Sequence, residues 1–121
     1  MELKSYLIDI DGTICDDIPN EEPERMATAG VYHDALETIN KWFEQGHEIS
    51  FFTARTIEHK EVTEEWLKKH CFKYSKVIYE KPRYVGKTYH VIDNRPIRAT
   101  NFQGAFTEFV RELKEVEVFE K

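Results

Sequence analysis

The 121-residue sequence lacks a long apolar run, and no segment approaches the ~18 consecutive apolar residues that a membrane span requires. The first residues carry one lysine followed by acidic residues, which is not the pattern of a secretory or transit peptide. We therefore expect a cytoplasmic protein with no membrane partner.

Cysteine is also scarce. Cys15 and Cys71 are the two cysteines of the chain, and they lie far apart in sequence. This spacing is typical neither of a zinc site nor of a disulfide framework, so we expect both thiols to be reduced. Cys15 comes shortly after an acidic motif, but we interpret it as a structural side chain rather than as a nucleophile.

Basic residues are fewer than acidic residues. The sequence has 17 Lys and Arg against 23 Asp and Glu, for a net charge of −6. A nucleic acid or an anionic membrane surface binds to a broadly basic face, so neither is an expected partner. A small local basic site is compatible with this balance.

What the sequence does contain is an alternation of short apolar runs and helical patterns. The four runs, which have the length and composition of buried strands, are residues 6–10, 48–53, 77–79 and 89–93. Apolar residues at helical spacing mark residues 31–46, 58–70 and 102–113, and a polar loop occupies residues 18–30. We expect one Rossmann-like domain, residues 1–121, with a three-layer α/β/α arrangement and a parallel sheet of about four to five strands.

Polar side chains follow each of the four predicted strands. Asp9 and Asp11 come at the end of the first, Thr53 ends the second, Lys81 follows the third, and Asp93 ends the fourth. The carboxyl ends of parallel strands meet at one edge of the sheet, and ligands of open α/β sheets bind outside those ends. The sequence therefore predicts one polar site drawn from four parts of the chain.

The residue types in this set suit a phosphate and a hard cation. Asp9 and Asp11, held close together, would repel one another unless a cation such as Mg²⁺ lies between them. Gly12 permits a positive φ, so that the following amides can point at an anion. The Thr53 hydroxyl can donate to a phosphate oxygen.

A lysine beside this site would neutralise a bound phosphoryl group. Lys81 precedes Pro82, which constrains how the chain leaves the third strand. Lys87, which lies in a turn-like context, is the competing candidate, and we favour Lys81. Asp93 offers an anionic oxygen to a metal, and Asn94 offers a neutral oxygen or a water-mediated contact.

The order of these motifs resembles the haloacid dehalogenase (HAD) superfamily of phosphatases. The matching segments are residues 9–13 (DIDGT), 50–53 (SFFT), 81–82 (KP) and 91–94 (VIDN). The resemblance implies that Asp9 attacks phosphorus to form an aspartyl-phosphate. It also implies that Asp11 first protonates the leaving oxygen and then deprotonates the hydrolytic water.

Cofactor and substrate contacts are implied in the same way. The resemblance places Mg²⁺ on the Asp9 side chain, the Asp11 backbone carbonyl, Asp93 and Asn94. The groups that would stabilise the phosphoryl oxygens are those of Gly12, Thr53, Ala54 and Lys81. Asn94 departs from the family pattern, because members often carry a second acid there, and this puts the strength of metal binding in question.

The segments between the motifs are too short for the cap domain that many HAD relatives carry. In Thr53-Ala54-Arg55 and in further residues the chain resembles a short, capless group, some of whose members are named capsular-polysaccharide biosynthesis phosphatases. This resemblance suggests a small phosphorylated metabolite, such as a sugar phosphate, as the substrate. Homo-oligomers would shield so open a site. Arg25 or Arg55 could reach a substrate anion, but we interpret each as a solvated or ion-paired surface arginine. We interpret the five histidines as structural or solvent-facing.

Two other functions compete with a phosphatase. One is a catalytically inactive HAD fold kept as a binding protein, for which Asn94 is a hint and the intact pair of Asp9 and Asp11 a counter-argument. The other is a receiver-like signalling domain phosphorylated on aspartate. Receivers place the acceptor aspartate between an early acidic pair and the threonine. Here no acidic strand end lies between the first pair and Thr53, and an aspartate follows the lysine instead, so we disfavour this alternative.

Overall fold

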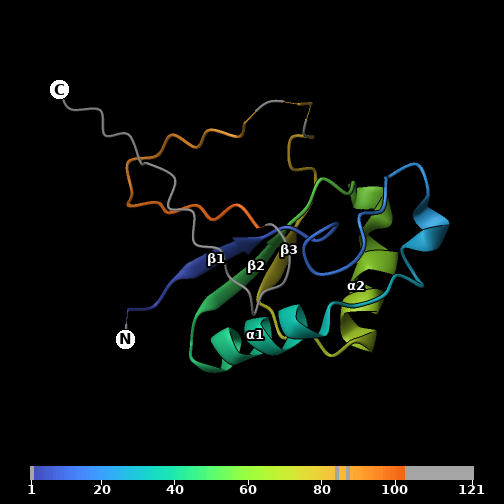
Figure 1. The fold of residues 1–121 in the computed structure, drawn as a ribbon, viewed down its shortest axis with the longest axis horizontal. Helices are drawn as coiled ribbons and strands as arrows, with labels where there is room; N and C mark the ends of the chain where they lie inside the picture. The colour runs from blue at the N-terminus through green and yellow to red at the C-terminus, as the bar shows by residue number, and fades with distance from the viewer. Residues whose placement is uncertain (1, 84, 87, 103–121) are drawn as a thin grey trace.

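A three-stranded parallel sheet forms the centre of the molecule (Figure 1). The computed structural model describes residues 2–83, 85–86 and 88–102. The strands are β1 (Ser5–Ile8), β2 (Glu48–Phe52) and β3 (Lys76–Ile78), in the spatial order β1-β2-β3. The predicted α/β architecture with a parallel sheet is confirmed.

The register brings the carboxyl ends of the strands together. Ile8 of β1 pairs with Phe51 of β2, and Phe52 pairs with Ile78 of β3. One further bond continues the ladder past β2, because the Thr53 amide donates to the Ile78 carbonyl over 3.0 Å. The residues that follow the three strands therefore leave the sheet at the same edge.

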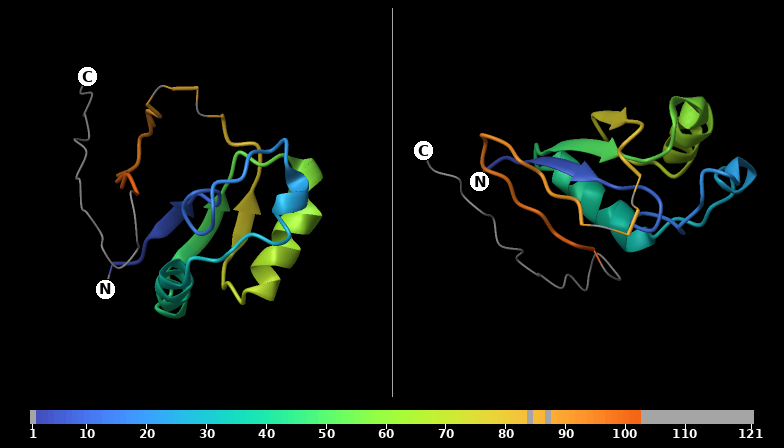
Figure 2. Two further views of the ribbon diagram at one scale, coloured as in Figure 1. Left: turned by 45° about the vertical axis from the view of Figure 1, so that its right-hand side comes forward. Right: turned by 90° about the horizontal axis from the view of Figure 1, so that it is seen from above.

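Among the described residues, two helices pack on this sheet and two short 3₁₀ turns precede or join them. The helical elements are η1 (Pro23–Arg25), α1 (His33–Glu44), η2 (Ile57–His59) and α2 (Lys60–Lys69). Further views show α1 against the sheet near β1 and β2, with α2 on the β3 side (Figure 2). Gly46 takes a φ of +98° just after α1 and ends it where the sequence predicts a stop.

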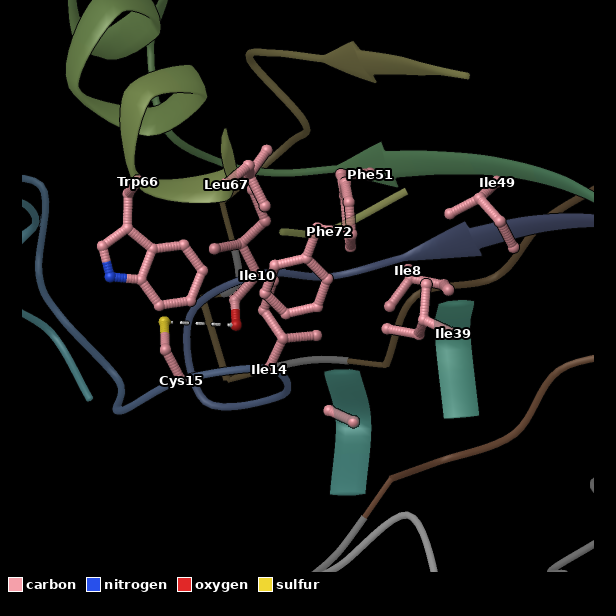
Figure 3. Close-up of a cluster of buried hydrophobic side chains, with 11 residues drawn as sticks. Ile8, Ile10, Ile14, Cys15, Ile39, Ile49, Phe51, Trp66, Leu67 and Phe72 are labelled. Carbon is pink, nitrogen blue, oxygen red and sulfur yellow. Dashed lines mark hydrogen bonds between the residues drawn. The ribbon is translucent and has the colours of Figure 1, made fainter. Parts of the chain in front are cut away.

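The core gathers side chains from both helices and from the strands (Figure 3). Phe51 meets Phe72 edge to face, with ring centroids 5.7 Å apart, and Trp66 stacks on the same Phe72 ring at 5.7 Å. The indole nitrogen of Trp66 donates to the Ala29 carbonyl over 2.9 Å, so this large side chain is buried with its polar atom satisfied. Each such side chain contributes roughly 1.5–3 kcal/mol by leaving water.

The turn after β1 is part of this core although it is irregular. Ile10, Ile14 and Cys15 are fully buried. The Ile14 amide donates to the Ile10 carbonyl over 3.0 Å, and the Cys15 thiol lies 3.8 Å from the same oxygen (Figure 3). Burial, reinforced by the nearby Asp11 carboxylate, raises the pKa of the Cys15 thiol to about 12. Cys15 is therefore a packed thiol and not an activated nucleophile.

The fourth predicted strand is not formed. Tyr89–Asp93 belongs to an irregular segment, drawn in orange, and its Val91 and Ile92 side chains are 62% and 76% exposed (Figure 1). An apolar run becomes a strand only when a neighbouring edge takes up its hydrogen bonds, and the described part of this sheet ends at β1. The predicted helix over 102–113 lies outside the described residues, except for Phe102. No helix in the described ranges is long and apolar enough to cross a membrane.

Candidate active site

Three chain segments converge where the strands end. The Lys81 amide donates to the Thr53 carbonyl over 2.9 Å, and the Glu80 amide donates to the Arg55 carbonyl over 2.9 Å. Glu80 adopts a φ of +62°, a conformation that turns the chain back at this point. The segments after β2 and β3 are thus joined beyond the sheet, and the segment after β1 meets them through its two aspartates.

Asp9 and Lys81 form an ion pair at this edge. The Lys81 ammonium lies 3.9 Å from Asp9 Oδ1, and the two side chains are 19% and 39% exposed for Lys81 and Asp9 respectively. Burial raises the pKa of the Asp9 carboxyl above its ordinary value, and the Lys81 charge opposes that rise. The structure therefore brings together the two side chains predicted to attack and to neutralise a phosphoryl group.

Aromatic rings line the Lys81 side chain. Its ammonium lies 4.8 Å from the centroid of the Tyr89 ring and 5.7 Å from that of Phe52. Both distances are within the range of cation–π attraction. Lys81 is therefore held on two sides while its charge stays close to Asp9; Lys87, the competing lysine, lies outside the described residues.

Asp11 is held by a buried arginine. Arg55 Nη2 donates to Asp11 Oδ1 over 2.8 Å, and Arg55 Nε donates to Asp11 Oδ2 over 3.0 Å. The remaining arm of the guanidinium, Nη1, donates to Thr63 Oγ1 of α2 over 3.0 Å. The Arg55 side chain is only 1% exposed. The interpretation of Arg55 as a surface arginine is therefore wrong, although it is indeed ion-paired.

Sequence reasoning missed this role because both partners are distant along the chain. Asp11 precedes Arg55 by 44 residues, and Thr63 follows it by 8. Only the folded sheet brings Asp11 to this arginine. The sole local signal was the position of Arg55 shortly after the end of β2 at Phe52.

Three backbone amides after β1 are used within the turn itself. Gly12 does take a positive φ, +79°. Its amide, however, donates to the Cys15 carbonyl over 2.9 Å, and the Thr13 and Ile14 amides both donate to the Ile10 carbonyl. These donors satisfy the acceptors of a tight turn, which removes them as phosphate ligands in this structure.

Thr53 and Ala54 are anchored in the same edge. Thr53 is fully buried, and its Oγ1 accepts a hydrogen bond from the Arg55 amide over 3.1 Å. A hydroxyl that accepts in this way keeps its own hydrogen for donation. The Ala54 carbonyl accepts a hydrogen bond from Asn20 Nδ2 over 3.0 Å, so the polar loop after β1 is tied to the site.

Asp93 and Asn94 do not join this cluster. Both are exposed, and Asp93 Oδ1 accepts a hydrogen bond from the nearby Arg95 amide over 3.0 Å. Within residues 2–83, 85–86 and 88–102, no three His, Cys, Asp or Glu side chains lie close enough to hold a metal ion. The predicted metal set is therefore not assembled, because the segment that carries Asp93 is not a strand of the sheet.

Two of the five histidines, which were predicted to be structural or solvent-facing, have a structural role. His47 Nδ1 accepts a hydrogen bond from the Lys4 amide over 3.0 Å, next to the first strand. His59 Nδ1 accepts one from the Thr56 amide over 3.2 Å and helps to begin the helical segment.

Two solved structures are similar to this fold. One is the crystal structure of an MCSG target from Vibrio cholerae, with a TM-score of 0.57 and 25% identity over 80% of this chain and 84% of that one. The other is a chain of the Pnkp1/Rnl/Hen1 complex, with a TM-score of 0.57 and 19% identity over 63% of this chain. The match spans only 27% of that longer chain. No curated protein sequence matches significantly.

A family model matches most of the described chain. It is described as "PITM 1-3, LNS2 domain", and the match runs over residues 6–92, from β1 through the segment that follows β3. This range contains Asp9, Asp11, Thr53 and Lys81. The parallel sheet, the acidic turn after its first strand and this match agree on a HAD-like phosphatase fold. The chain belongs to the LNS2 domain family of PITM 1-3.

Proposed function

We propose that this protein is a HAD-type phosphomonoester hydrolase that works through an aspartyl-phosphate on Asp9. The observation that carries the proposal is the pairing of Asp9 with Lys81 at the strand ends, with Asp11 held beside them. The LNS2 match supports a phosphatase at a coarse level. The nucleophile, the substrate and the cofactor are proposals.

The first step would transfer the phosphoryl group to the protein. A carboxylate oxygen of Asp9 forms a bond to phosphorus while the bond from phosphorus to the ester oxygen breaks. The leaving oxygen takes a proton from Asp11. Asp9 must be ionised to attack, and the Lys81 ammonium at 3.9 Å favours that form against the effect of burial.

The second step would release phosphate. Asp11, now deprotonated, accepts a proton from water as the water oxygen attacks the phosphorus of the intermediate. The bond between phosphorus and Asp9 breaks, which restores the Asp9 carboxylate and leaves Asp11 protonated for the next turnover. Through both steps Lys81 would attract the phosphoryl oxygens, and Thr53 would contribute its hydroxyl hydrogen.

Mg²⁺ is the cofactor that the family resemblance implies. Asp9 and Asp11 supply hard oxygen donors at the right edge, but Asp93 and Asn94 are exposed on a different segment. The described residues thus fit only part of the implied ligand set. Mg²⁺ remains a prediction to be tested by chelation, and no step above depends on it.

The proposed substrate is a small phosphorylated metabolite, with sugar phosphates ahead of nucleoside monophosphates. This order rests on the resemblance to short capless phosphatases. The site residues described above would bind the phosphoryl group, which every phosphomonoester shares. Selectivity would therefore come from the polar loop of residues 14–30 or from a second copy of the chain that shields the open edge.

The decisive experiment measures phosphate release from a panel of phosphomonoesters, with Mg²⁺ and with EDTA. We expect Asp9→Asn to lower kcat/KM by about a thousandfold or more, because the amide cannot act as the nucleophile. Glu24→Gln is the matched control, since it removes one negative charge from an exposed residue of η1. Release that survives Asp9→Asn, or that falls equally in Glu24→Gln, would refute the assignment of Asp9.

A non-catalytic phosphate-binding role is the second candidate. It is favoured by the exposed position of Asp93 and Asn94, away from the strand-end cluster. In that case the wild-type protein would release no phosphate from any ester. Inorganic phosphate would still raise its melting temperature, and Lys81→Met would abolish that rise.

A further inference from the structure

We infer that Arg55 is a positioning residue that holds the Asp11 carboxylate in place for proton transfer, with Thr63 as its second anchor. The inference rests on the proposed function, in which Asp11 exchanges a proton with the leaving oxygen and then with water. Arg55 itself would contact neither substrate nor the reacting atoms.

The geometry fixes both the position and the plane of the carboxylate. Two nitrogens of one planar guanidinium donate to the two oxygens of Asp11, at 2.8 and 3.0 Å. Such a fork-to-fork pair leaves the carboxylate little freedom to rotate. Because each oxygen keeps a second lone pair, Asp11 can still meet a proton on the side away from Arg55.

The guanidinium is in turn fixed from the opposite side. Its third nitrogen donates to the Thr63 hydroxyl at 3.0 Å, and Thr63 is fully buried in α2. Arg55 is therefore held between a strand-end acid and a packed helix. Lysine cannot replace it in this role, since an ammonium is a single point charge without the planar fork.

The backbone of Arg55 connects the same residue to the other strand ends. Its amide donates to Thr53 Oγ1 at 3.1 Å, and its carbonyl accepts from the Glu80 amide at 2.9 Å. Glu80 directly precedes Lys81, which pairs with Asp9. The hydrogen bonds of Arg55 therefore connect all three strand ends. They reach Asp11 after β1, Thr53 after β2, and Glu80, the neighbour of Lys81, after β3.

Stability alone is a poor reason for this ion pair. Taking a charged arginine out of water is costly, and apolar replacements of buried ion pairs are often neutral or stabilising. The pair involves the one acid of the DIDGT segment that the proposed reaction uses for proton transfer. A role in orienting that acid explains why the charge is buried here.

The test compares two esters that differ in how much their leaving group needs a proton. An alkoxide leaving from n-propyl phosphate requires one, whereas 2,4-dinitrophenolate leaves without one. We expect Arg55→Lys to lower kcat/KM, which reports only the first step, by about a hundredfold on n-propyl phosphate and by less than about fivefold on 2,4-dinitrophenyl phosphate. Arg25→Lys, at an exposed arginine, is the matched control and should change neither rate.

Two further variants separate positioning from a general loss of structure. Asp11→Asn should show the same selective loss, and the double variant with Arg55→Lys should lose no more than Asp11→Asn alone, because both changes disable one proton transfer. Thr63→Val removes only the anchor hydroxyl, so it should give a smaller loss with the same selectivity. It also serves as the test if Arg55→Lys fails to fold.

The results separate a failure of the positioning role of Arg55 from a failure of the proposed phosphatase activity. Equal losses of kcat/KM on both esters, or additive losses in the double variant, would overturn the positioning role while leaving the phosphatase intact. A wild-type protein that releases phosphate from neither ester would overturn both.

Discussion

Two irregular segments of this protein carry similar apolar residues next to aspartates, but one segment buries these residues and the other exposes them. Residues 9–18, here called the β1 turn, bury Ile10 and Ile14 completely. Residues 88–102, here called the distal segment, leave Val91 and Ile92 62% and 76% exposed. Apolar composition next to an acid therefore does not by itself decide burial.

Long-range anchoring accounts for the difference. The β1 turn is tied to the start of α1, because the Tyr32 amide donates to the Ile14 carbonyl at 2.9 Å and Cys15 forms a bridge with Val31. Those ties place its side chains under both helices. In the distal segment, Tyr89 donates to the Pro82 carbonyl and the Arg95 amide to Asp93, both bonds spanning few residues. Local bonds of that kind do not pair residues 89–93 with a strand, although Phe102 at the end of the distal segment packs against the core.

The largest expected effect concerns the thiol of the β1 turn. In Cys71→Ser at pH 8, we expect Cys15 to react with iodoacetamide about a thousandfold more slowly than an ordinary thiol, because a pKa of about 12 leaves almost no thiolate. The reaction should accelerate as the pH rises toward 12. Mass spectrometry of the native variant gives the rate, and the urea-unfolded variant is the control. Rapid native modification at pH 8 would contradict the buried position of Cys15.

Stability measurements give the next contrast. Ile14→Ala should lower the free energy of unfolding by about 3 kcal/mol, since it leaves a cavity in the core. Ile92→Ala should lower it by less than about 0.5 kcal/mol, since the side chain is already exposed. Urea titrations of both variants provide the values. An equal loss of free energy of unfolding at the two positions would mean that Ile92 is buried. That result would contradict the comparison and favour the fourth strand that the sequence predicts over residues 89–93.

The smallest expected effect bears on the metal. The family resemblance implies that Asp93 is a metal ligand, so Asp93→Asn should raise the Mg²⁺ concentration for half-maximal phosphate release by about tenfold. Asn94→Asp should lower that concentration, since it adds a charge. Initial rates over a Mg²⁺ titration measure both. Unchanged values would confine any metal site to the residues of the strand-end cluster and sharpen the contrast between the two segments.

Much of the fold could be predicted because local patterns are enough for it. Periods of 3.6 residues and short β-branched or aromatic runs predicted α1, α2 and all three strands close to their observed bounds. The strand predicted over residues 89–93 is wrong because it also rested on local pattern alone. A strand needs, in addition, a neighbouring strand that takes up its hydrogen bonds. No local pattern in that run contains this information.

The candidate site also has one part that could be predicted from the sequence and one part that could not. Asp9, Thr53 and Lys81 were predicted from their positions at strand ends, and parallel pairing does bring those ends together. The amides after Gly12 could not be judged from sequence, because only the turn geometry shows that they are used within the turn. Their acceptors, the carbonyls of Ile10 and Cys15, are available only when the turn closes.

By itself the sequence determined the order of strands and helices, the parallel sheet and the polar residues at its edge, because each depends on spacing along the chain. Tertiary structure alone decided which charges are buried and with whom. Arg55 shows the reason most clearly, since a guanidinium leaves water only where folding presents distant acceptors in its own plane. Asp11 and Thr63 do so here, from two different elements.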